Sequence, residues 1–213
     1  MMKRGWMLLL ILFAVVGFSG MANAGLIKIG TATYGGKDYN LIYEDDQGLI
    51  WLDYTNPANR WLQQTAWAAG LNASGVLTYK LNAGIRVTWD GDWRLPKAAD
   101  GVRKGGYDGK TTAGFNITTS EMGHLYYVSL GNLGYYDTKG NMQDGWGGLH
   151  KTGPFNNLLS NSYWSGTLYS EDSEHAWDFS MHFGDQDNNG FKDSDPYYGL
   201  AVRPGHVVSA PVR

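Results

Sequence analysis

The chain has 213 residues, of which 30 are glycine and 14% are aromatic, and its formal net charge is −3. An acidic chain repels phosphate backbones, which argues against nucleic acid as a partner. Because the chain contains no cysteine, it can have no disulfide, thiol nucleophile or cysteine-containing zinc site.

The first 24 residues are typical of a secretory signal peptide. Lys3 and Arg4 precede an almost uninterrupted apolar run over 6–18, and Ala22-Asn23-Ala24 offers small residues to a signal peptidase. The run is shorter than the roughly 20 apolar residues that span a bilayer. We therefore expect cleavage near Ala24 and a secreted or periplasmic protein without a membrane span in its mature form.

The remaining residues, 25–213, read as one domain with uniform composition. Two strands are predicted over 39–43 and 48–53, joined by an acidic turn. The spacing of apolar and small residues over 62–71 predicts a first helix. Thr118 and Glu121 have the spacing of a capping box, which predicts that a second helix begins there and continues to the glycine at 131.

Short strands are predicted in the second half of the chain, over 162–165, 176–183 and 198–203. In the middle segment, apolar residues alternate with polar ones, which is typical of a strand with one face in solvent. The apolar residues are Trp177, Phe179, Met181 and Phe183, and the polar ones are Asp178, Ser180 and His182. Early helices followed by an antiparallel sheet indicate an α+β fold.

Four short motifs carry a resemblance to a known family. They are Gly48-Leu49-Ile50-Trp51-Leu52, Trp93-Arg94-Leu95-Pro96, Tyr163-Trp164-Ser165-Gly166 and the segment from Gly199 to Gly205. With these motifs the chain resembles the Lcl C-terminal domain family, bacterial exported domains largely of unknown function, over about 38–207. The resemblance implies a C-type-lectin-like fold. Such a fold has two helices, a small antiparallel sheet in which the two chain ends pair, and long irregular loops.

Eight residues form the structural signature, seven of them within these motifs and Trp177 within the predicted strand over 176–183. We expect the tryptophans to fill the core, because large aromatic side chains usually bury their area in packing. We expect the arginines to bind backbone carbonyls or a carboxylate such as Asp92 or Asp53. The signature residues are Trp51, Trp93, Arg94, Pro96, Trp164, Trp177, Arg203 and Pro204.

The loops are the candidate ligand-binding surface. Segments 101–114, 134–153 and 171–173 and the acidic turn from Asp185 are rich in Tyr, Asn, Ser, Asp and Gly, which adaptable binding surfaces favour. Exposed turns need the same composition for conformational reasons alone. The candidate binding rings are Trp146, Tyr135, Tyr136 and Tyr169, with Trp146 expected to be the most exposed.

The acidic turn has the pattern of the first part of a calcium-binding loop. Asp185, Asp187, Asn189 and Asp193 occupy positions one, three, five and nine, and a glycine occupies position six. Position twelve is Pro196, where a bidentate Glu is expected. The turn therefore has two interpretations, a Ca²⁺ site or a solvated acidic turn.

The most direct functional hypothesis is an exported, non-catalytic binding or adhesion module that takes an unknown glycan or protein ligand. An envelope or extracellular-matrix component without a discrete ligand is the alternative. The third candidate is an enzyme such as a glycoside hydrolase. No catalytic residue is predicted, because the five histidines lack metal-ligand spacing and no carboxylate pair stands out. No cofactor is required beyond the possible Ca²⁺.

Overall fold

The computed structural model describes residues 25–146 and 148–209, so the predicted signal peptide lies outside the described residues. The helical segments are α1 (Trp61–Gly70), α2 (Glu121–His124) and the π-helical turn η1 (Leu125–Ser129). The strands are β1 (Leu26–Tyr34), β2 (Lys37–Glu44), β3 (Leu49–Asn59), β4 (Thr78–Leu81), β5 (Ile85–Trp89), β6 (Gly105–Gly106), β7 (Ala113–Phe115), β8 (Ser162–Leu168), β9 (Ala176–Ser180), β10 (Asp185–Asp187) and β11 (Tyr197–Ser209). The fold is therefore α+β, as predicted. The prediction of a small antiparallel sheet is wrong, because the described residues form an eleven-stranded sheet in which two of the pairings are parallel.

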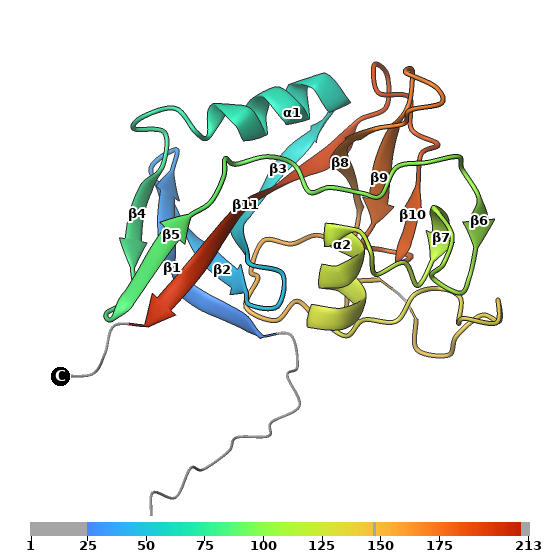
Figure 1. The fold of residues 1–213 in the computed structure, drawn as a ribbon, viewed down its shortest axis with the longest axis horizontal. Helices are drawn as coiled ribbons and strands as arrows, with labels where there is room; N and C mark the ends of the chain where they lie inside the picture. The colour runs from blue at the N-terminus through green and yellow to red at the C-terminus, as the bar shows by residue number, and fades with distance from the viewer. Residues whose placement is uncertain (1–24, 147, 210–213) are drawn as a thin grey trace, which may run out of the picture.

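The strands form one sheet in the order β4-β1-β2-β3-β11-β8-β9-β10-β7-β6, and β5 pairs with the far part of β11 (Figure 1). β11 joins the two halves of the sheet. It pairs antiparallel with β3, where Val202 faces Trp51, and parallel with β8, where Tyr198 faces Tyr163. β1 lies in the same sheet, but β2 and β3 separate it from β11. The expected direct pairing of the two chain ends is therefore wrong.

The core lies on both faces of β3 and β11. Alternate residues of a strand point to opposite faces. Trp51 packs with the residues of α2 and η1, whereas Ile50 and Leu52 pack with Trp93 and the residue that follows α1. Figure 1 shows α1 and α2 on different sides of this central pair. The four signature indoles are buried as expected, each no more than 1% exposed, and they are Trp51, Trp93, Trp164 and Trp177.

The predicted wet face of the 176–183 strand is wrong. β9 ends at Ser180, and Asp178 and Ser180 are only 6% and 7% exposed. β8 and β10 flank β9. On β8, Trp164 pairs directly with Asp178, and its ring lies 4.5 Å from that of Tyr197. These two rings cover the face that the sequence pattern assigns to solvent.

The first helix is confirmed within one residue, but the second begins differently. Its N-cap is Ser120, whose Oγ accepts a hydrogen bond from the amide of Gly123, so the predicted cap at Thr118 is wrong. Glu121 does not reach back to the helix start. Both of its carboxylate oxygens accept hydrogen bonds from Arg94, each 2.7 Å long. A stronger, charged donor displaces the backbone amide that a capping box would use.

Candidate functional site

The two signature arginines brace irregular backbone. Arg94 forms the bidentate ion pair with Glu121 and also donates to the carbonyl of Leu95. The guanidinium of Arg203 lies 4.4 Å from the ring centre of Trp89, and its Nε donates to the carbonyl of Gly91. Both are structural contacts of the kind expected, although the carboxylate partner of Arg94 is neither of the two expected from the sequence.

Asp53 is one of those two expected carboxylates, and its partners are backbone amides. It is 1% exposed and accepts hydrogen bonds of 2.9 Å from the amides of Asn156 and Asn157. Burial raises the pKa of Asp53, and these hydrogen bonds oppose the rise. Asp53 therefore fixes the loop before β8.

The surface cavities nearest to the predicted binding loops are two clefts that share Arg103. The first has a volume of about 320 Å³, and the second about 240 Å³. The first is lined by Arg103, Tyr169, Asp172, His175, Asn188 and Asn189. The second is lined by Arg103, Gly105, Gly106, Tyr107, Gly114, Phe115, Asp185 and Asp187. We call the two together the Arg103 groove. It is formed by β6, β7, β10 and the loops beside them.

Arg103, the residue that lines both clefts, forms a bidentate ion pair with Asp187. Arg103 donates from Nε and Nη2 to the two oxygens of Asp187, over 2.7 and 2.8 Å. The Arg103 side chain is 48% exposed, and its guanidinium carries donors beyond the two that bind Asp187. Because the planar guanidinium holds both oxygens at once, the pair fixes the orientation of the remaining Arg103 donors in the groove.

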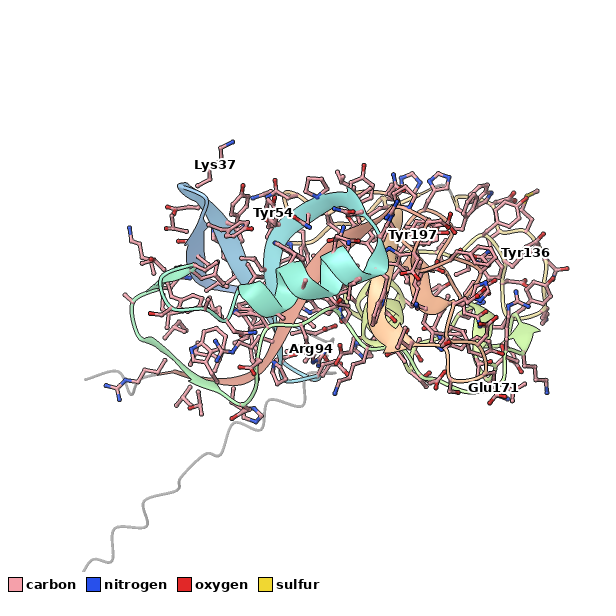
Figure 2. The ribbon with its side chains drawn as sticks, turned by 90° about the horizontal axis from the view of Figure 1, so that it is seen from above. Lys37, Tyr54, Arg94, Tyr136, Glu171 and Tyr197 are labelled. Atoms are coloured by element: carbon pink, nitrogen blue, oxygen red, sulfur yellow. The ribbon has the colours of Figure 1, made fainter. Side chains whose placement is uncertain are left out.

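Aromatic side chains extend from the second cleft across the end of the molecule. We call them the aromatic belt: Tyr107, Phe115, Tyr135, Tyr136, Trp146 and Phe183. The ring of Tyr136 lies 5.0 Å from the rings of Tyr107 and Phe115, and Tyr135 links it to Trp146 at 4.6 and 4.1 Å. Figure 2 shows Tyr136 and Glu171 at the opposite end of the molecule from Lys37.

The structure brings together three of the four predicted binding rings. Tyr135, Tyr136 and Trp146 belong to the aromatic belt, whereas Tyr169 lines the first cleft with its ring 5.7 Å from that of Trp177. Trp146 is half-buried rather than fully open to solvent, because Tyr135 and Phe183 pack against it.

The four predicted calcium ligands do not form one loop. Asp185 and Asp187 lie on strand β10, and Asp187 is held by Arg103. Asn189 is exposed, and Asp193 pairs with Lys192 over 3.0 Å and is 74% exposed. The four residues therefore do not lie on a single calcium-binding loop, and Arg103 already occupies both oxygens of Asp187.

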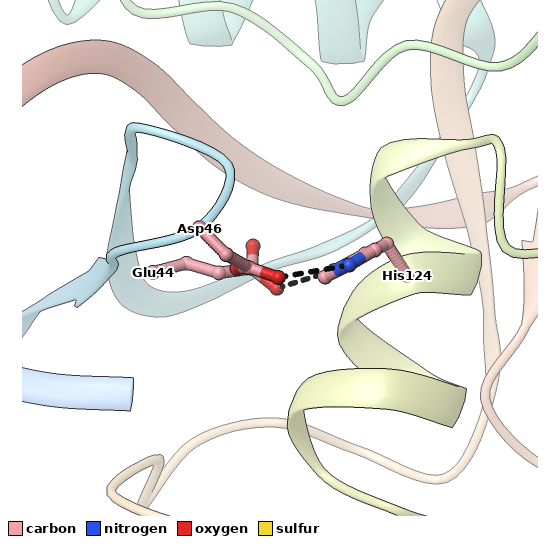
Figure 3. A group of neighbouring side chains, drawn as sticks. All are labelled: Glu44, Asp46 and His124. Atoms are coloured by element: carbon pink, nitrogen blue, oxygen red, sulfur yellow. Dashed lines mark hydrogen bonds and ion pairs between the residues drawn. The ribbon is translucent and has the colours of Figure 1, made fainter. Parts of the chain in front are cut away.

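A second polar cluster joins the turn after β2 to α2 (Figure 3). The imidazole of His124 lies between two carboxylates, with Nδ1 3.0 Å from Glu44 and Nε2 3.1 Å from Asp46. Glu44 is fully buried and also accepts from Ser129 Oγ and, over 2.8 Å, from the indole of Trp51. The hydrogen bond to Glu44 and the attraction of both carboxylates raise the pKa of His124 against the effect of burial.

Among the described residues, these three side chains form the one group of three or more Asp, Glu or His residues whose ligand atoms all lie close enough to share a metal ion. However, each ring nitrogen already faces a different carboxylate, so the ligands do not converge on one side of the ring. Glu44 has a partner at both oxygens. The arrangement therefore suits an imidazolium clamped between carboxylates and joining α2 to the sheet.

The π-helical turn η1 explains how Ser129 reaches this cluster. Its defining hydrogen bond runs from the amide of Leu130 to the carbonyl of Leu125, over 2.9 Å. Five residues make one turn here, so Ser129 lies on the same side as His124, and their Oγ and Nδ1 are 3.3 Å apart. An α-helix would carry a residue five positions on away from that side.

No family model, curated protein or solved structure matches this chain. Among the described residues, no helix is long and apolar enough to cross a membrane.

Sequence reasoning missed the roles of Arg103 and Glu44 in these sites and the burial of Asp178 in β9. Arg103 sits in a mixed-charge loop, and nothing in the sequence pairs it with a residue 84 positions away. Glu44 belongs to an acidic turn that looks solvated. Asp178 is one of the alternating polar residues of 176–183, a pattern that ordinarily indicates a strand face exposed to solvent. In each case the informative contact is made by tertiary packing.

Proposed function

We propose that this protein is an exported binding module with a C-type-lectin-like fold and that the Arg103 groove binds a carbohydrate. The observation that carries the proposal is the composition of the groove. Tyr107 and Phe115 line one cleft and Tyr169 lines the other, and Arg103, whose guanidinium binds Asp187, lines both. Ligand sites combine apolar walls with a few fixed polar groups in this way.

The polar groups also suit a hydroxyl-rich ligand. The amides of Asn188 and Asn189 offer donors and acceptors, and Arg103 offers donors that are oriented by Asp187. Sugar rings present hydroxyl edges and flat apolar faces, which match planar donors and aromatic walls respectively. The fold class is supported by the central strand β11, the helical segments α1 and α2, and the long irregular stretch between β7 and β8.

The proposal is tested with the purified domain 25–213 on a glycan array, followed by titration calorimetry with each glycan that binds. Tyr107→Ala removes a ring that is 44% exposed, and Tyr169→Ala removes the opposite wall. Each is expected to weaken binding about tenfold, equivalent to about 1.4 kcal/mol. The matched control is Tyr39→Ala, at the β1–β2 end of the molecule, which should bind as the parent does.

Two results would refute the proposal. The first is that no glycan binds the folded domain at millimolar concentration. The second is that Tyr107→Ala and Tyr169→Ala retain the parent affinity for every glycan that binds, because the ligand would then contact another surface.

A further inference from the structure

Asp178 is a buried carboxylate that the architecture does not explain. It lies in the middle of β9 and is 6% exposed, and its Oδ2 has no hydrogen-bond partner among the described residues. A buried polar atom without a partner is costly, and native proteins rarely leave one. Burial, with three neighbouring carboxylates, raises the pKa of Asp178 well above its usual range.

A second carboxylate, on the adjacent strand, also has a buried oxygen without a hydrogen-bond partner in the part of the chain that the structure describes. Oδ1 of Asp185, on β10, is buried and also lacks a partner among the described residues. In the register of β9 with β10, Asp178 pairs with Asp187 and Ser180 pairs with Asp185. Directly paired residues share a face, as do residues two apart on one strand. Asp178 and Asp185 therefore project from the same face of the two strands, which lie side by side in Figure 1.

The charges around these two carboxylates are not balanced by the protein. The groups that act on Asp178 are Asp185, Asp187 and Asp195, all acidic. The nearby guanidinium, Arg103, is committed to both oxygens of Asp187. Asp195 Oδ2 accepts the amide of Phe191. Asp178 and Asp185 are thus left with buried oxygens that face negative charge.

We propose that Asp178 and Asp185 bind a calcium ion buried between β9 and β10. Ca²⁺ takes six to eight oxygen ligands in flexible geometry, and backbone carbonyls or waters can complete the shell that two carboxylates begin. A divalent cation would balance both charges and give each orphan oxygen a partner. The site differs from the predicted loop, because it includes Asp178 and leaves Asp187 with Arg103.

The experiment uses the domain 25–213 stripped with a chelator at neutral pH and titrated separately with CaCl₂ and with Tb³⁺. Tb³⁺ is expected to luminesce when the nearby indole of Trp164 is excited. Saturating Ca²⁺, at about 100 times its Kd, is expected to raise the thermal midpoint by about 5–10 °C. Asp178→Asn and Asp185→Asn should each lower Ca²⁺ affinity at least tenfold.

Two controls separate loss of the site from loss of the fold. Asp193→Asn changes a carboxylate that is 74% exposed and lines neither cleft, and this variant should bind Ca²⁺ as the parent does. Asp178→Asn removes a carboxyl group whose ionised form is disfavoured by burial and by neighbouring carboxylates, and it keeps the shape. Without metal, this variant should therefore melt at least as high as the stripped parent. A parent that shows neither Tb³⁺ luminescence nor a Ca²⁺-dependent midpoint overturns the proposal, as does unchanged affinity in Asp178→Asn. Because glycan binding is scored separately on the array, failure of one proposal is distinguishable from failure of the other.

Discussion

Replacing His124 by Gln is expected to lower the thermal midpoint, and to do so more at low pH than at high pH. His124 is 13% exposed and lies between Glu44, which is fully buried, and Asp46, which is 34% exposed. Removing one partner of a buried ion pair costs about 3–5 kcal/mol, because the other charge stays buried. The exposure of Asp46 and the donors from Trp51 and Ser129 favour the lower end, about 3 kcal/mol.

The pH dependence follows from the direction of the pKa shift. The pKa of His124 is higher in the folded protein than its ordinary value of 6.5. Protonation therefore favours the folded state. The contribution of protonated His124 to the free energy of unfolding is complete below about pH 6.5 and is lost as the pH rises through the raised pKa of the folded state. Consequently the difference between parent and His124→Gln should be largest near about pH 5.5 and should shrink by about pH 9.

The assay is thermal unfolding followed by circular dichroism at both pH values. In a domain of this size about 3 kcal/mol corresponds to about 6–12 °C in the midpoint. His206→Gln is the matched control. His206 faces Asp90 at 3.2 Å but is 69% exposed, so its midpoint should change by no more than about 2 °C. An equal fall at both pH values would refute the imidazolium clamp.

Three further substitutions test the buried hydrogen bond of Trp51, the ion pair of Arg94 with Glu121, and the β6–β7 pairing beside the groove. Trp51→Phe removes the indole donor to buried Glu44 and should cost about 2 kcal/mol in urea unfolding; a neutral effect would contradict that hydrogen bond. Arg94→Lys keeps the charge but loses the paired 2.7 Å contacts with Glu121, and should cost about 1 kcal/mol by thermal unfolding. Gly114→Ala places a Cβ 2.0 Å from a backbone oxygen of β6 at a φ of +103°, so amide exchange in β6 and β7 should rise while β3 stays protected.

Local sequence patterns predicted correctly those elements whose formation depends on residues close together in the chain. The spacing of apolar and small residues over 62–71 predicts α1, and short strand-forming segments, the first two joined by an acidic turn, locate β2, β3 and β8. Tryptophans within strands of an aromatic-rich chain had no other place to bury their area. Each of these outcomes follows from side-chain size and period, which the sequence states directly.

Sequence patterns gave wrong predictions where a residue far away in the chain determines a side chain's burial or hydrogen bonding. The alternation through Asp178 has the period of a half-solvated strand, but β8 and β10 and the ring of Trp164 enclose it. Glu121 has capping-box spacing, but Arg94, 27 positions away, binds it. A charged donor or a covering ring outweighs a local preference of about 1 kcal/mol. The groove could not be predicted for the same reason.

The buried polar atoms of the described residues that lack a hydrogen-bond partner lie beside the Arg103 groove. The proposed calcium site and the proposed glycan site are therefore neighbours. In the described part of the chain, the buried side-chain atoms without a partner belong to Asp178, Asp185 and Gln186, all on β9 or β10. Asp185 also lines the second cleft. A cation bound to Asp185 would fix β10, and with it Asp187 and the orientation of Arg103. Binding coupled in this way is reciprocal, so Ca²⁺ should raise glycan affinity by the same factor by which the glycan raises Ca²⁺ affinity. Calorimetry of each ligand with and without the other measures both changes in affinity. If neither ligand changes the affinity for the other, the calcium site and the groove are independent and the coupling is refuted. Unequal changes would show that the samples are not at equilibrium.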